Sequence, residues 1–321
     1  MLPASALSSD TPPMRSSLML DFDPDVMSVA IQQGALEHVQ LQPGFFKGQI
    51  AHTASTDSRV DWGAYTLSLL ARGDLSADMV TIAVAVQGQG DWRVHGRDAM
   101  SGDIVVFPER GELLAVLPPQ AQWLSVQIPR QRLEAAGLSV RNGVAHRLSC
   151  GTSPELQRTL AELRPVLAPS PELYTHDNHA VAHAHDQLVA ALLSQLARPS
   201  QAGDAGAALS PGERWHVVRR AEQYLQECGD PSVRIEDLCM AACTSLSRLE
   251  RAFRETFGVG PRRYLTLRRL AAVRRELLRR GEQTSVTEVA TRWGFFHLGR
   301  FSQDYKTLFG ETPSQTLRHL S

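Results

Sequence analysis

The chain has few cysteines, no long apolar run and no signal-peptide pattern. Its four cysteines (Cys150, Cys228, Cys239 and Cys243) are scattered over 321 residues, as expected for reduced thiols in a cytoplasm. No apolar run approaches the roughly 20 residues that a bilayer-spanning helix needs, so we expect no membrane partner. Residues 1–15 lack an apolar core after a charged start. We therefore expect a disordered arm there and a cytoplasmic protein.

The chain also lacks the residue patterns of an enzyme. It contains no phosphate-binding glycine loop and no Ser–His–Asp signature. A metal-dependent barrel enzyme would need a closely spaced His-x-His pair and a glutamate on its strands. The β-rich segment offers His95 alone, and His52 is distant from it. We predict no catalytic residues, no catalysis and no cofactor.

A histidine-rich segment, from His176 to His185, is the strongest candidate for a metal site. His179 and His183 are four residues apart, so on a helix they would share one face and could bind a transition metal. The simpler interpretation, which we favour, is the polar face of a bundle helix, and we predict no metal site. Cys239 and Cys243 have the same spacing, and we interpret them as packing thiols rather than a redox switch.

Charge is distributed unevenly along the chain. Residues 1–210 carry 14 Lys+Arg and 21 Asp+Glu, a net charge of −7, whereas residues 211–321 carry 19 and 13, a net charge of +6. A basic C-terminal module favours a polyanionic partner. The segment 199–212 is rich in Ala, Gly, Ser and Pro, which is typical of a flexible linker. We therefore predict one domain at 16–198 and a second at 213–321.

The last hundred residues contain one motif written twice, 52 positions apart. The copies run from Arg234 to Leu265 and from Val286 to Leu317. The identical pairs are Glu236/Glu288, Leu246/Leu298, Arg248/Arg300, Phe257/Phe309, Gly258/Gly310, Pro261/Pro313 and Leu265/Leu317. In each copy the apolar spacing predicts a short helix, a turn and a second helix.

The second helix of each copy is predicted to have a buried aromatic stripe. The stripes are Leu249, Phe253 and Phe257 in the first copy, and Phe301, Tyr305 and Phe309 in the second. Ser245 is placed to cap the first of these helices. Gly258 is placed to end it in a left-handed conformation, and Pro261 to begin the helix that follows.

The opposite faces of the two helices carry the candidate DNA contacts. Arginine can bind guanine, glutamate can accept from cytosine, and glutamine can read adenine. The candidates are Ser247, Arg248, Glu250, Arg251 and Arg254 in the first copy, and His297, Leu298, Gly299, Arg300, Ser302, Gln303 and Lys306 in the second. Because Gly299 offers no side chain, we predict that the second helix relies more on phosphate contacts and on DNA shape.

A basic segment, residues 261–280, joins the two copies. We predict an amphipathic helix whose eight arginines lie on its surface, near DNA. A helix of about 19 residues spans about 28 Å at 1.5 Å per residue. Since one turn of B-DNA is about 34 Å, such a connector could hold two reading helices about one turn apart.

Residues 213–320 resemble the double helix-turn-helix domain of the AraC/XylS family of bacterial transcription regulators. The resemblance is carried by SRLERAF, RETFG and VGP in the first copy and by WGFFHLGRFSQDYKTLFGETPSQTL in the second. These motifs are most similar to those of the family branch that contains XylS and the ethanolamine regulator. The resemblance implies two recognition helices, Ser245–Phe257 and His297–Phe309, in successive major grooves. It also implies double-stranded promoter or operator DNA and RNA polymerase as partners.

The N-terminal region alternates in a β manner over residues 16–150. Strands are predicted at 79–86, at 92–96, within 101–118 and at 121–129, with Gly- and Pro-rich turns between them. Many short strands of this kind predict a barrel or a sandwich. The resemblance implies a cupin-like barrel that binds a small effector, followed by helices at 153–168 and 171–197 that form a homodimer. The predicted fold class is α+β, with a β-barrel and helical dimerisation segment before an all-α domain.

The candidate effector contacts are Lys47, Trp62, Tyr65, Trp92 and His95, because aromatic residues with one basic group would suit an apolar acid. We predict a sequence-specific transcription regulator, an activator, controlled by a small molecule. The alternative is an effector-independent or protein-regulated factor whose barrel only dimerises. A remote alternative is a metal-dependent cupin enzyme with a DNA tether.

Overall fold

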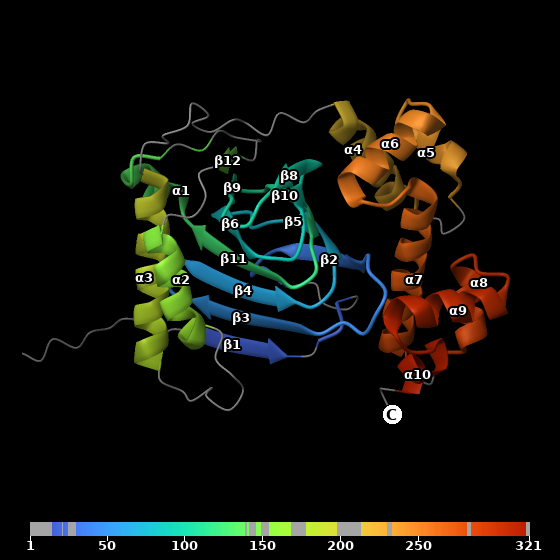
Figure 1. Cartoon of the computed structure of the whole chain (residues 1–321), viewed down its shortest axis with the longest axis horizontal. Helices are drawn as coiled ribbons and strands as arrows, with labels where there is room; N and C mark the ends of the chain where they lie inside the picture. The colour runs from blue at the N-terminus through green and yellow to red at the C-terminus, as the bar shows by residue number, and fades with distance from the viewer. Residues whose placement is uncertain are drawn as a thin grey trace, which may run out of the picture.

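The computed structural model describes residues 15–20, 22–24, 30–138, 140, 146–148, 154–167, 178–197, 213–229, 233–280 and 284–318. The predicted linker at 199–212 lies outside the described residues, as does the predicted arm except for Arg15. The described residues form four layers (Figure 1): helices α2 and α3, a large sheet, a smaller sheet, and the C-terminal helices.

The strands form two antiparallel sheets, with orders β1-β3-β4-β11-β6-β9-β12 and β2-β5-β10-β7-β8. The strands are β1 (Arg15–Leu20), β2 (Ala35–Gln40), β3 (Gly48–Ala54), β4 (Arg59–Tyr65), β5 (Leu69–Asp74), β6 (Val80–Gln87), β7 (Trp92–Val94), β8 (Arg97–Ala99), β9 (Ile104–Phe107), β10 (Glu112–Leu117), β11 (Ala121–Ile128) and β12 (His146–Leu148). The N-terminal region is β-rich, as predicted. Among the described strands no pairing closes a ring, so the expected barrel is two open sheets that face each other.

Side-chain alternation along the strands separates two apolar layers. On β11, Trp123 points into the space between the sheets, whereas Leu124 and Val126 point to the opposite face. The inner core therefore takes residues from both sheets. The outer face of the larger sheet is covered by helices α1 (Arg130–Ala135), α2 (Pro154–Leu167) and α3 (Asn178–Ala197).

Helix α3 is described from Asn178 to Ala197, within the predicted 171–197, and residues 168–177 lie outside the described part. His185 does not lie on a polar face of this helix. It is fully buried, and its ring nitrogens hydrogen-bond to the hydroxyls of Thr53 and Ser58 at 2.8 Å each. Burial lowers the pKa of His185. The described residues contain no group of three or more potential metal ligands, and their helices include none suited to crossing a bilayer.

The C-terminal region is all-helical, as predicted. Its helices are α4 (Glu213–Cys228), α5 (Ile235–Ala241), α6 (Leu246–Phe257), α7 (Pro261–Arg280), α8 (Val286–Arg292), α9 (Leu298–Phe309) and α10 (Pro313–Arg318). Helix α7 runs between two helical units, α4–α6 at one end and α8–α10 at the other (Figure 1). Two helix-turn-helix units are therefore attached to one connector.

The predicted ends of the second helices are confirmed. The Ser245 hydroxyl accepts a hydrogen bond from the Arg248 amide at 3.4 Å, and so caps α6. Gly258 and Gly310 both end their helices in the left-handed region, with φ of 76° and 78°. His297 occupies the cap position of α9 as predicted, but its side chain makes no capping hydrogen bond.

The two copies do not keep one offset throughout. Helix α6 and helix α9 start 52 positions apart, but α5 starts at Ile235 and α8 at Val286, an offset of 51. Asp237, not Glu236, is therefore the structural counterpart of Glu288, because both are the third residue of their helix. The extra residue lies in the turn between α8 and α9, where Phe296 is 76% exposed.

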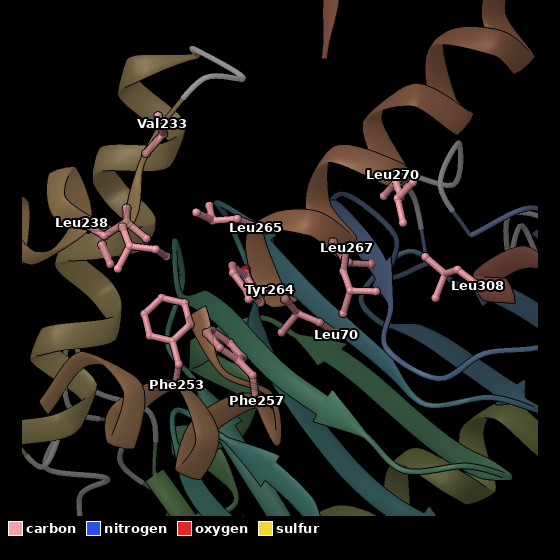
Figure 2. Packing of buried hydrophobic residues seen from close by; sticks show 14 of the residues in the cluster. Leu70, Val233, Leu238, Phe253, Phe257, Tyr264, Leu265, Leu267, Leu270 and Leu308 are labelled. Carbon is pink, nitrogen blue, oxygen red and sulfur yellow. The ribbon is translucent and has the colours of Figure 1, made fainter. Parts of the chain in front are cut away.

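The outer face of the smaller sheet packs against the C-terminal helices. Leu70 lies beside Tyr264 and Leu267 of α7 (Figure 2), within one buried cluster that also contains Val39 and Leu114. Trp215 of α4 joins this cluster and stacks on His95, with ring centroids 4.7 Å apart. The two predicted domains thus share an apolar interface.

A buried ion network crosses this interface. Arg72 of β5 pairs with Glu37 of β2 and with Glu222 of α4, and all three side chains have at most 30% of their surface exposed. Burial alone would raise the pKa of Glu37, but Arg72, Arg268 and Arg275 together lower it to about 2. Glu37 therefore remains a carboxylate at neutral pH.

The arginines of α7 do not all lie on a free surface, which corrects the sequence-based prediction. The Arg274 Nε donates to Asp23 at 2.6 Å, and Arg275 donates to Glu37 at 2.9 Å. Arg269 donates to the Val233 carbonyl, and Arg268 lies 4.0 Å from Glu222. Acidic groups of the N-terminal domain and of a neighbouring helix thus hold Arg268, Arg274 and Arg275, and a backbone carbonyl holds Arg269.

Acidification between pH 6.5 and 4 is expected to destabilise the fold through His95. Burial against Trp215 lowers the pKa of His95 to about 4, so the unfolded chain binds a proton in this range and the folded chain does not. Stability is then fully present above pH 6.5 and falls by up to about 1.4 kcal/mol per pH unit on acidification. Urea unfolding at several pH values in this range should show that the free energy of unfolding changes less steeply with pH in His95→Phe than in the unsubstituted protein. Parallel curves for the two proteins would contradict the assignment.

Candidate DNA-binding interface

Helix α6 presents its predicted contact residues to solvent. Ser247, Arg248, Arg251 and Arg254 are exposed, and Glu250 is half-buried. The Arg251 Nε donates to Glu255 at 2.9 Å, one helical turn away, and Arg254 lies 3.6 Å from Glu250. These exposed pairs are weak and can exchange for DNA groups at little cost. The buried stripe beneath them holds the helix in place.

A basic hollow beside α6 adds residues that sequence reasoning missed. Arg214, His216 and Arg220 of α4 line it together with Arg248 and Arg251, around a volume of about 550 Å³. Arg214 of α4 pairs at 2.5 Å with Glu255 of α6, the same carboxylate that accepts a hydrogen bond from Arg251. The signal was present in the sequence as a run of cations in RWHVVRR, directly after the predicted linker.

The two cysteines singled out by their spacing lie just before α6, Cys239 within helix α5 and Cys243 in the turn that follows it. Cys239 is half-buried, and burial together with Glu236 raises the pKa of its thiol. Cys243 is exposed at a positive φ of 49°. A thiol with a raised pKa is a poor nucleophile, which is consistent with a packing role for Cys239.

Helix α9 presents a different surface. Gln303 and Lys306 are exposed, Ser302 is half-buried, and the Arg300 side chain is 85% exposed, with Asp304 3.9 Å away. Exposed His297 and Leu298 lie at its start. A Cβ added at Gly299 would meet nothing within 4 Å, so this position is open space.

The connector sets the separation of the two units. Helix α7 has 20 residues, so it is about 30 Å long. One turn of B-DNA is about 34 Å, which matches two helices that enter neighbouring major grooves on one face of a duplex. The structure brings the candidate residues into two exposed patches, one on α6 and one on α9.

The predicted effector contacts do not lie together. Tyr65 and Trp92 belong to the wall of a cavity between the two sheets. Trp62 is on the opposite face of its sheet, packed in the layer that α3 covers. Lys47 lines a separate surface hollow that Tyr65 also borders, and His95 lies at the interface with Trp215. The roles of these five residues stay predictions.

Comparison with known proteins agrees with the helical geometry. Residues 238–319 match the model of a helix-turn-helix domain family. A probable thc operon regulatory protein of Rhodococcus erythropolis is 36% identical over 103 residues, 32% of this chain and 31% of that protein. A XylDLEGF operon transcriptional activator of Pseudomonas putida is 37% identical over 100 residues, 31% of this chain and 30% of its own length. The matched segment thus spans about a third of these curated relatives.

Among solved structures, the fold is similar to that of the AraC-like transcriptional activator CuxR. The match has 15% sequence identity and a TM-score of 0.38, and it covers 80% of this chain and 94% of that one. A probable AraC family transcriptional regulator from Rhodopseudomonas palustris is 32% identical, with a TM-score of 0.30. The match covers 32% of this chain and 95% of that one.

Proposed function

We propose that this chain, whose C-terminal part is an AraC/XylS-type helix-turn-helix domain, is a transcription regulator that binds specific DNA sequences through α6 and α9. The observation that carries the proposal is the pair of exposed polar helix faces on one connector helix of matching length. The matched relatives are regulators, and we propose no enzymatic activity for this chain.

The N-terminal domain is proposed to sense a small effector and transmit its binding through the smaller sheet. Leu113 and Ala115 of β10 line the cavity, whereas Leu114 and Val116, which alternate with them, pack on the C-terminal helices. A shift of this single sheet would therefore move the surface on which α7 rests. Because packed layers transmit displacement, effector binding can change the population of DNA-binding arrangements.

Further partners are part of the proposal. Helices α2 and α3 pack together on the larger sheet, away from the DNA-binding helices, and this leaves them available to form a homodimer (Figure 1). An activator at a promoter would also contact RNA polymerase, as the resemblance implies. Such a protein works in the cytoplasm, where the bacterial chromosome lies.

Selection of bound duplexes from a random DNA pool tests the proposal. We expect an enriched site with two conserved blocks centred about 10–10.5 base pairs apart, since the two helices read successive major grooves. The block read by α6 should be the more sharply defined, because α9 carries Gly299. Failure to enrich any sequence, or enrichment of a single short block, would count against DNA binding through both helices.

Arg300→Ala and Lys306→Ala are each expected to lower DNA affinity for every sequence to a similar extent. Both side chains are exposed on α9 and suit phosphate contacts, which carry no sequence information. Loss of one phosphate contact should reduce the slope of log K against log salt by about 0.9. Gel-shift titrations at several salt concentrations measure this slope, and an unchanged slope would exclude the contact.

A further inference from the structure

The space between the sheets exists because small residues line it. The cavity has a volume of about 80 Å³. Five alanines contribute to its wall from both sheets, namely Ala71, Ala83, Ala85, Ala99 and Ala115. Larger residues at these inward positions would fill the space, since protein interiors are otherwise close-packed.

The wall provides no compensation for a charged ligand. It is almost entirely apolar, and among the described residues that line it none is a lysine or an arginine. Its one carboxylate, Asp103, accepts a hydrogen bond from the Met100 amide at 2.7 Å. An anionic ligand would lose its hydration and meet this acidic group, and His38 is the one side chain of the wall that could carry a positive charge, so binding of an anion is unfavourable.

Four residues of the same wall carry a buried polar atom without a hydrogen-bond partner. They are the Tyr65 hydroxyl, the Trp92 and Trp123 indole nitrogens and the Ser125 hydroxyl. Trp123 lies beside Tyr65, with ring centroids 6.0 Å apart, but the two make no hydrogen bond of acceptable geometry. Burial raises the pKa of Tyr65, so its hydroxyl keeps its proton.

All four of these groups can donate a hydrogen bond. Each unsatisfied buried group destabilises a protein by about 1–3 kcal/mol, so four in one wall call for an explanation. A bound molecule with an acceptor atom would satisfy one or more of them. Gly63 supports this arrangement, because a Cβ there would come within 2.5 Å of the Trp123 ring.

We propose that this cavity binds a compact, uncharged molecule with an apolar body and a hydrogen-bond acceptor, such as a ketone, aldehyde or ester oxygen. An apolar cavity of about 150 Å³ holds benzene, so about 80 Å³ limits the ligand to a small ring or short chain unless the sheets separate. This ligand class replaces the apolar acid suggested by the sequence. Its role as an effector rests on the proposed function, but its binding does not.

Three planar probes of four heavy atoms each test the ligand class on the full chain: acetone, isobutene and acetate. The protein has five tryptophans, so ¹⁵N labelling of tryptophan gives indole N–H signals that are easily resolved. Acetone should shift the Trp92 or Trp123 signal in a saturable manner, and bind more tightly than isobutene. The carboxylate should not bind. Tighter binding of the carboxylate, or no saturable shift with the ketone, would overturn the proposal.

Two substitutions that change the side-chain volume little can identify which hydroxyl group contacts the ligand. Tyr65→Phe and Ser125→Ala each remove one unsatisfied hydroxyl, so without ligand each should leave the melting temperature unchanged or raise it. At least one should weaken acetone binding roughly 2- to 12-fold and leave isobutene binding unchanged. Val126→Ala, next to Ser125 in β11 but on the opposite face of the sheet, is the matched control; it should lower the melting temperature and leave the binding of both probes unchanged. Unchanged ketone selectivity in both variants would exclude these hydroxyls as the recognising groups.

Gel shifts with the selected DNA separate this inference from the proposed function. If acetone binds and DNA affinity does not change, the ligand class stands and its role as an effector falls. If DNA is bound and no probe occupies the cavity, the ligand class falls and the DNA-binding function stands.

Discussion

Replacing Arg72 with alanine is expected to destabilise the protein by about 3–5 kcal/mol, because the buried carboxylate of Glu222 and the half-buried carboxylate of Glu37 lose a shared buried cation. Arg72 is 4% exposed and pairs with Glu37 and Glu222, which come from different domains. The substitution leaves both carboxylates in a site of low polarity. Urea unfolding monitored by circular dichroism measures the change in the free energy of unfolding.

Two further variants make this result specific. Asp98→Ala removes an exposed ion pair with Arg93 on the same sheet, and should cost no more than about 1 kcal/mol. Combining Arg72→Met with Glu222→Gln removes charge from both sides of the interface, and should recover much of the lost stability. A loss below about 1 kcal/mol for Arg72→Ala would mean that water screens the network and that it does not hold the domains together.

Arg251→Ala is expected to weaken binding to the selected DNA site by about 1–3 kcal/mol, roughly 5- to 150-fold, and to relax discrimination at one base position. Arg251 is 70% exposed on α6, so the fold should change by no more than about 0.5 kcal/mol. Its bond to Glu255 must exchange for the bond to a base edge. Competition gel shifts with single-base variants of the site measure the specificity.

Arg300→Ala is the matched control, because it removes an arginine at an exposed position of the other second helix. It should weaken all sequences alike, whereas Arg251→Ala should affect the cognate base most. Equal losses for every base in the Arg251 variant would assign this side chain to a phosphate. The model in which α6 reads bases and α9 mainly positions the protein would then be wrong.

Local patterns in the sequence were sufficient to predict the helix-turn-helix units. Helix caps depend on a few neighbouring residues, so Ser245, Gly258 and Gly310 could be assigned from the sequence alone. The constant offset of 52 failed at α5 and α8 because one residue is added in the second turn. An identity such as Glu236/Glu288 then compares residues at different helical positions.

Contacts between distant segments could not be predicted in this way. An amphipathic pattern shows that α7 has a polar side, but it does not show whether that side faces water, DNA or another domain. Arg274 and Arg275 meet Asp23 and Glu37, which lie about 240 positions or more earlier in the chain. The cavity was missed for a similar reason, since its lining alanines carry no chemical signal until two sheets face each other.

The capture of the α7 arginines has an electrostatic consequence for the whole chain. Asp23 and Glu37 act as internal counter-ions, which neutralise part of the C-terminal domain before any nucleic acid arrives. The +6 charge of residues 211–321 therefore overstates the charge available to a polyanion. The N-terminal domain and DNA draw on the same pool of guanidinium groups, so anything that separates the two domains would strengthen the long-range attraction to DNA.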